Sequence, residues 1–267
     1  MATSALPAVL DGYRRTSFTA EGKRRDVFEI GGGPAVIVIS EIPGITPLVA
    51  DFGRRVAATG CTAVLPHLFG DPGRSVSGGY MARVAGSACI SKEFTTLALK
   101  RTSPVTTWLR ALARDAHARC GGPGVGVVGM CLTGGFALAM MVEEIVLAPV
   151  LSQPSLPFGW SDAHKRDLGI DDADLECVKT RCEAGVKILG LRFTGDKMSP
   201  PERFERLRRE LGDAFVAVEI DSSPGNPEGY RRSAHSVLTE DLRDVEGSAT
   251  QAALQQVLAM FRDKLLA

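Results

Sequence analysis

Several apolar runs rich in β-branched residues recur along the chain, and they restrict its fold more than any other feature. Apolar and polar residues do not alternate within them, which is typical of strands buried on both faces of a parallel sheet. The clearest runs are Ala35–Ile39, Thr62–Leu65, Val125–Val128 and Val186–Phe193, and Phe215–Ile220 supplies the last predicted strand. Such a sheet needs helices on both of its faces.

Helices with recognisable ends are predicted between these strands. Proline at a first helical position and glycine just past the end are the main signals. The predicted starts are Thr46-Pro47, Ser103-Pro104, a capping box at Ser199–Glu202, and Ser248 with Gln251 three residues later. Strands and helices therefore alternate to the end of the chain.

This alternation predicts an α/β fold with a mostly parallel central sheet and helices on both faces. No internal repeat or low-complexity linker interrupts the chain, so we expect residues 1–267 to form a single domain. The polar stretch Asp162–Glu183 is too charged for a strand and is interpreted as a surface insertion. Functional side chains are expected just past the carboxyl ends of the strands.

Charge and composition limit the partners of the chain. Its 31 basic and 31 acidic residues cancel, and the Arg203–Glu210 segment is mixed in sign, as on a solvated helix face. The uncharged stretch Gly124–Val142 contains five glycines, which favours a buried strand, turn and helix over a membrane span. We therefore expect no nucleic-acid or membrane partner, and a monomer or homodimer.

The cysteines and histidines show no metal-binding pattern. The six cysteines, at positions 61, 89, 120, 131, 177 and 182, have scattered spacings and no Cys-x-x-Cys pair, and the four histidines are equally dispersed. The first residues lack the basic and apolar regions of a secretion signal. A cytoplasmic protein with reduced thiols and no structural metal is the expectation.

The most informative motif is Gly129-Met-Cys131-Leu132-Thr133-Gly134-Gly135. It passes from a predicted strand to a predicted helix, with small residues around one nucleophile, as a nucleophile elbow requires. The helix N-terminus would favour a thiolate at Cys131 and present the Leu132 N–H to an oxyanion.

Two other interpretations apply to this region. Cys131 fits equally well as a small buried hydrophobic residue at a strand-to-helix junction. The pattern Gly124-x-Gly126-x-x-Gly129 matches a dinucleotide fingerprint, but its first two glycines precede the strand instead of following it. We therefore predict no bound cofactor.

A cysteine nucleophile needs a base and an acid that orients it, and both follow Cys131 in the chain. Asp196 lies on the turn after a predicted strand, where an ordinary turn aspartate is the alternative. A polar loop after the last strand leads to His235, and His67 is the rival base. No Gly-x-Ser-x-Gly motif follows a strand, which argues against a serine nucleophile.

Glu41 is a further candidate because it emerges at the end of the Ala35–Ile39 strand. A carboxylate buried there is costly without a partner. Glu41 is expected to interact with the Cys131 thiol, and the N–H of Ile42 to complete an oxyanion hole. The alternative is an exposed acid in a Glu-Ile-Pro-Gly turn.

Taken together, these segments resemble the dienelactone hydrolase family from about Ala35 onward. The motifs that carry the resemblance are Ile39–Gly44, Ala63–Pro66, Gly129–Gly135, Gly195-Asp196 with Pro200, and His235-Ser236. The resemblance implies an α/β-hydrolase fold and cleavage of a lactone or small carboxylic ester through a thioester acyl-enzyme, without a cofactor.

The resemblance also implies roles for single residues. Cys131 would be the nucleophile, His235 the base, Asp196 the orienting acid and Glu41 the residue that tunes the thiol.

The sequence departs from the family pattern at Thr133, where glycine is usual, and at Thr239, where substrate-binding members have an arginine. Arg83, Arg231 or Arg232 is expected to replace that arginine. The alternative function is a noncatalytic or redox-sensing scaffold of the same fold that binds a small molecule.

Overall fold

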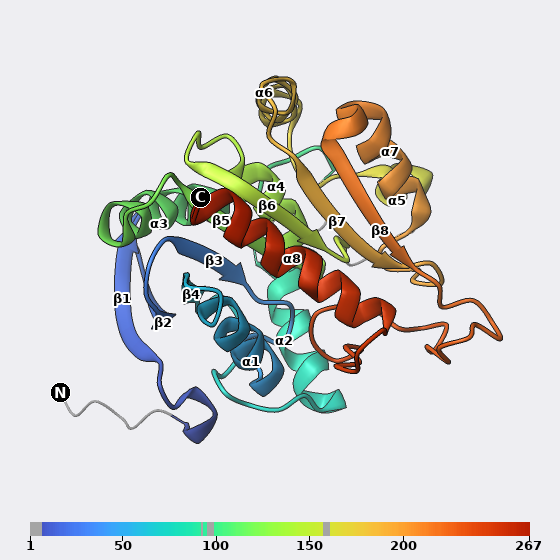
Figure 1. The fold of residues 1–267 in the computed structure, drawn as a ribbon, viewed down its shortest axis with the longest axis horizontal. Helices are drawn as coiled ribbons and strands as arrows, with labels where there is room; N and C mark the ends of the chain where they lie inside the picture. Colours follow the sequence, from blue (N-terminus) through green and yellow to red (C-terminus); the bar gives the residue numbers. More distant parts are fainter. Residues whose placement is uncertain (1–6, 92, 95–98, 157–160) are drawn as a thin grey trace.

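A computed structural model describes residues 7–91, 93–94, 99–156 and 161–267, with the side chains of 89 and 90 excepted. The core is one eight-stranded sheet of order β1-β2-β4-β3-β5-β6-β7-β8 (Figure 1). Its strands are β1 (Arg14–Ala20), β2 (Lys23–Gly31), β3 (Ala35–Ile39), β4 (Thr62–Pro66), β5 (Val125–Met130), β6 (Val146–Ser152), β7 (Ile188–Phe193) and β8 (Phe215–Ile220).

The sheet is mostly parallel, as predicted. β1 and β2 form an antiparallel hairpin, β2 pairs antiparallel with β4, and every other neighbouring pair is parallel. All five predicted strands form, although the fourth begins at Ile188 instead of Val186. β1 was not among them because it is an edge strand with exposed and half-buried residues in alternation, and so lacks a continuous apolar run.

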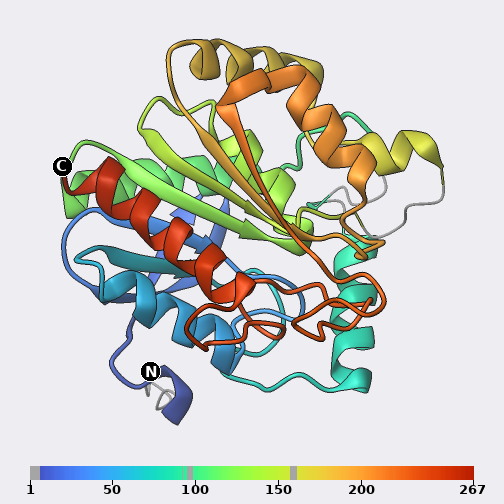
Figure 2. The ribbon, with the colours of Figure 1, turned by 45° about the vertical axis from the view of Figure 1, so that its right-hand side comes forward.

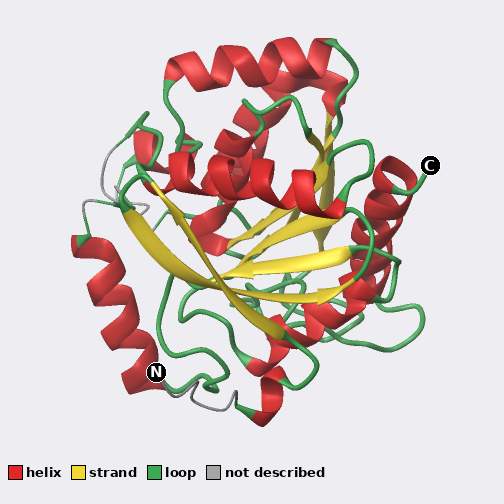
Figure 3. Cartoon of the chain, turned by 90° about the vertical axis from the view of Figure 1, so that its left-hand side faces the viewer, coloured by secondary structure: helices red, strands yellow, loops and turns green. Residues whose placement is uncertain are grey.

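Helices cover both faces of the sheet (Figure 3). One layer contains α1 (Pro47–Ala57) and α8 (Ala249–Leu265), whose apolar residues share one core with the sheet. The helices α2 (Gly78–Ile90), α3 (Val105–Cys120), α4 (Gly134–Met140), α6 (Asp172–Glu183) and α7 (Pro201–Leu211) contribute to the other core. This arrangement confirms the predicted fold class.

Of the four predicted helix starts, two agree with the structure, one is off by a residue because Pro104 caps α3 instead of beginning it, and one is wrong. The Thr46 side chain caps α1 and the Ser248 side chain caps α8, as expected. The capping box at Ser199 is wrong, because α7 begins at Pro201, whose fixed φ suits the first helical position. Pro200 then occupies the cap, and proline has no side-chain oxygen to accept a hydrogen bond.

The polar stretch between β6 and β7 forms two helices, α5 (Asp162–Arg166) and α6. α5 buries no residue, whereas α6 buries Leu175 and Val178. Only the first part of this stretch is therefore a surface excursion, because α6 contributes to the core.

The carboxyl ends of the parallel strands meet at one end of the sheet. Figure 2 shows the loops after β6, β7 and β8 gathered there, beside α2. β3 and β5 are neighbours, with Ile39 opposite Gly129, so Glu41 and Cys131 leave adjacent strand ends.

Two further observations concern the described residues alone. None of their helices is long and apolar enough to cross a membrane. The five cysteines whose side chains are described are free thiols, and the side chain of Cys89 lies outside the described part.

Candidate active site

Cys131 lies on a sharp turn between β5 and α4. It has a φ of 56°, which is uncommon for a residue other than glycine and indicates local strain. A Cβ on Gly129 would lie 2.2 Å from the carbonyl oxygen of Thr133, so the turn leaves no room for a side chain there. Gly126 lies inside β5, so the dinucleotide-like pattern does not form a phosphate-binding loop.

Thr133, the departure from the family pattern, is buried within this turn. Its hydroxyl accepts a hydrogen bond from the Met130 N–H at 2.8 Å. The same hydroxyl lies 2.9 Å from the carbonyl oxygens of both Ile39 and Met130, and can donate to either. The threonine thus fixes the shape of the elbow and links it to the end of β3.

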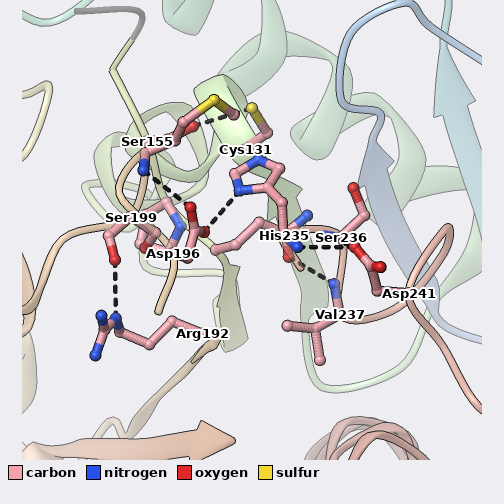
Figure 4. Close-up of polar contacts among 12 residues, drawn as sticks. Cys131, Ser155, Arg192, Asp196, Ser199, His235, Ser236, Val237 and Asp241 are labelled. Carbon is pink, nitrogen blue, oxygen red and sulfur yellow. Dashed lines mark hydrogen bonds and ion pairs between the residues drawn. The ribbon is translucent and has the colours of Figure 1, made fainter. Parts of the chain in front are cut away.

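Asp196 and His235 meet although 39 residues separate them. Asp196 follows β7, and its Oδ2 lies 2.6 Å from Nδ1 of His235. Its Oδ1 accepts from the Met198 N–H at 2.9 Å. Asp241, which sequence reasoning missed, holds His235 in place: its carboxylate accepts a hydrogen bond from the His235 backbone N–H at 2.7 Å. Figure 4 shows the imidazole between Asp196 and Cys131.

The environment of His235 favours its charged form. Burial alone would lower the pKa of His235, but interactions with Cys131 and Asp196 outweigh burial and raise it well above its ordinary value. The Nε2 atom is buried and has no hydrogen-bond partner among the described residues. This nitrogen is therefore available for proton transfer.

Ser155 is the direct neighbour of the thiol, and sequence reasoning missed it. Its Oγ lies 2.9 Å from Sγ of Cys131, and its N–H donates to the Cys131 carbonyl at 3.0 Å. Ser155 lies in the loop after β6, a strand that was not among the predicted ones. Its position past a strand end is the only signal that could have indicated it.

Glu41 is buried, with 6% of its surface exposed, and its hydrogen bonds involve other residues than Cys131. Oε2 accepts from Ser236 Oγ at 2.7 Å and from Gln153 Nε2 at 3.2 Å. Oε1 accepts from the Thr239 hydroxyl. The carboxylate is thus held by three uncharged donors, while the thiol contacts Ser155.

The two predicted oxyanion donors lie in two separate turns. Leu132 is in the first turn after the elbow, where N–H groups have no intrahelical acceptor. Ile42 lies in a turn that the Gly44 N–H closes by donating to the Glu41 carbonyl at 2.7 Å. Both residues follow ends of neighbouring strands.

The predicted substrate-binding arginines are engaged elsewhere. Arg83 pairs with Asp71 and lines a cavity of about 240 Å³ between the loop after β4 and α2. Arg231 pairs with Asp241, and its side chain is 74% exposed. Arg232 is exposed as well.

The rival base His67 belongs to a separate turn. Its Nε2 bonds to the carbonyl oxygen of Gly70 at 2.7 Å.

Arg203 contradicts the interpretation of its segment as a solvated helix face. Only 3% of its surface is exposed, and it lies in the first turn of α7. The segment's alternating charges gave no indication of this, because the acceptors of Arg203 are backbone carbonyls and leave no trace in the sequence.

Comparisons with known proteins identify the family of the chain. The family model described as "Dienelactone hydrolase family" matches residues 29–265. The chain belongs to the dienelactone hydrolase family. The predicted hydrolase of carboxylic esters or lactones is thereby confirmed at the level of the family.

Individual relatives are distant. An Escherichia coli (strain K12) protein named "Putative carboxymethylenebutenolidase" is 24% identical over 242 residues, which are 86% of this chain and 79% of that protein. A "Putative Dienelactone Hydrolase" from Klebsiella pneumoniae subsp. pneumoniae MGH 78578 has a TM-score of 0.61 at 19% identity, covering 93% of this chain and 97% of that one. The dienelactone hydrolase from Anabaena variabilis ATCC 29413 has a TM-score of 0.60 at 15% identity, covering 95% and 98%. These two structures share the fold.

Proposed function

We propose that this protein hydrolyses a lactone or small carboxylic ester through Cys131, His235 and Asp196. The observation that carries the proposal is the Asp196–His235 pair at 2.6 Å beside a cysteine on a strained elbow. Membership of the family supports the reaction class. We also propose that the substrate is a small molecule and that the protein is a cytoplasmic monomer or homodimer that needs no cofactor.

In the first half of the reaction, the Cys131 proton passes to Nε2 of His235 and the thiolate attacks the carbonyl carbon. The electron pair of the carbonyl bond moves to oxygen, where the N–H groups of Leu132 and Ile42 stabilise the charge. Collapse of this intermediate breaks the carbon–oxygen bond. The leaving oxygen takes the proton from His235 and a thioester remains.

In the second half, His235 accepts a proton from water as the water oxygen attacks the thioester carbon. The carbon–sulfur bond breaks, the carboxylic acid leaves, and the sulfur takes the proton back from His235, which restores the starting thiol and imidazole. Asp196 holds the imidazole in the tautomer that each step needs and stabilises its charged form.

The experiment is turnover of aryl esters and dienelactones by Cys131→Ala, with Cys120→Ala as a control for loss of an unrelated thiol. We expect Cys131→Ala to lose at least about 10²-fold in kcat, because the covalent route is removed. Undiminished turnover would contradict the proposal. If neither substrate is turned over by the wild type and iodoacetamide fails to label Cys131 at any pH, the noncatalytic scaffold is favoured instead.

Recognition of a substrate carboxylate is a separate part of the proposal. Arg83 and Arg231 are the candidate contacts, although each is paired with an aspartate. A panel of lactones that differ only in the carboxylate, assayed with Arg83→Gln and Arg231→Gln, tests them.

A further inference from the structure

Arg203 is a buried cation that backbone carbonyls hold. Its Nε donates to the Asp167 carbonyl at 2.7 Å and its Nη2 to the His164 carbonyl at 2.9 Å. Its Nη1 donates to the carbonyls of Pro154 at 2.8 Å and Met198 at 3.2 Å. Among the described residues, no carboxylate forms an ion pair with this guanidinium. Burial of a charge is costly, and the four carbonyl acceptors offset part of this cost.

Two of these carbonyls belong to the loops that support the triad. Pro154 precedes Ser155, whose hydroxyl contacts the Cys131 thiol. Met198 donates its N–H to the Asp196 carboxylate and offers its carbonyl to Arg203. One side chain therefore joins the loop that contacts the nucleophile to the loop that carries the acid.

The charge of Arg203 also acts on the active site. Burial lowers the pKa of Arg203 to about 10, while the neighbouring charges of Asp167, Cys131 and Asp196 oppose this shift. The guanidinium thus stays charged at neutral pH. Electrostatic interactions of such a buried charge are stronger than in water.

We propose that Arg203 is a positioning residue of the active site, which fixes the Ser155 and Asp196 loops and stabilises the Cys131 thiolate. This inference rests on the proposed role of Cys131 as nucleophile. Arg203 itself does not touch the reacting atoms.

Arg181 provides a matched control on α6. It also donates to four carbonyls, those of Met141, Glu143, Glu144 and Val146. These lie between the end of α4 and the start of β6, away from Cys131. Burial lowers the pKa of Arg181 too. A substitution there removes a comparable set of hydrogen bonds without affecting the triad loops.

The test compares Arg203→Met, Arg203→Lys, Arg181→Met and the wild type. The readouts are kcat and KM for an aryl ester, the pH dependence of iodoacetamide alkylation at the Cys131 peptide followed by mass spectrometry, and the thermal unfolding midpoint. We expect Arg203→Met to need a higher pH for half-maximal alkylation and to lose about tenfold or more in kcat, with KM nearly unchanged. Arg203→Lys should keep the alkylation profile, because it keeps the charge, and still lose kcat.

Arg181→Met should lower the unfolding midpoint and leave both site readouts, kcat and the alkylation profile, at the wild-type level.

The inference is overturned if Arg203→Met retains the wild-type alkylation profile and kcat, or if Arg181→Met changes them equally. If Arg203→Met does not fold, Arg203→Lys decides: wild-type kcat would refute the positioning role. Cys131→Ala separates the two proposals, since its undiminished turnover refutes the nucleophile itself.

Discussion

Two carboxylates leave strand ends close to Cys131, and their surroundings differ. Asp196 pairs with an imidazole at 2.6 Å, in the arrangement that a triad needs. Glu41 is held by the uncharged donors of Gln153, Ser236 and Thr239. The difference shows that a strand end determines where a side chain lies, whereas the neighbouring loops determine its partner.

The largest effect is expected on the Asp196 side. His235→Gln removes the base, and we expect a loss of at least about 10²-fold in kcat. Asp196→Asn should have a similar effect, because the imidazole loses the partner that orients it. Steady-state kinetics with an aryl ester measure both variants. His67→Gln is the control, and equal losses in all three would contradict the assignment of His235.

On the Glu41 side we expect a change in stability more than in rate. Glu41→Gln replaces one acceptor by an N–H₂ donor that faces hydroxyl or amide donors, and should cost about 1–3 kcal/mol of the free energy of unfolding. Thr239→Val, which removes one donor, should cost about 1 kcal/mol. Chemical denaturation and kcat are the measurements. A loss of kcat as large as that of His235→Gln would mean that Glu41 acts directly on the thiol.

The smallest effect is the pH dependence of stability. Burial lowers the pKa of His235, but Cys131 and Asp196 together raise it above its usual value. A pKa raised on folding contributes stability below about pH 6.5, and this contribution is lost as pH rises through the pKa of the folded state. The wild type should therefore exceed His235→Gln in free energy of unfolding most strongly at acid pH. Denaturation curves across pH test this, and a difference that grows with pH would contradict it.

Much of the fold could be predicted because most of its strands are runs of mainly apolar residues. β3, β4, β5 and β7 are buried along their whole length, since both faces of each are covered, whereas β8 is a partly exposed edge strand that was still recognisable from its apolar residues. The edge strand β1 was not predicted because its exposed and half-buried residues alternate, so it contains no continuous apolar run. The start of α7 was predicted wrongly because Pro201, and not the residue after Ser199, begins the helix.

The candidate site could be predicted as far as the backbone determines it. Cys131, Asp196 and His235 each follow a strand, and glycines surround the turn that carries Cys131. Ser155 and Arg203 could not be predicted, because the partner of Ser155 is a thiol 24 residues away and three of the four carbonyl partners of Arg203 lie 36 to 49 residues away. Such contacts arise only when the chain has folded.

The most direct test of the account is mass spectrometry of the protein quenched in acid during turnover of a p-nitrophenyl ester. We predict an acyl group on the Cys131 peptide, released by hydroxylamine as a thioester is, and absent in Cys131→Ala. His235→Gln should show little acylation, because the Cys131 thiol lacks its proton acceptor. Turnover without any acyl-cysteine, or with the acyl group on another residue, would contradict the central claim.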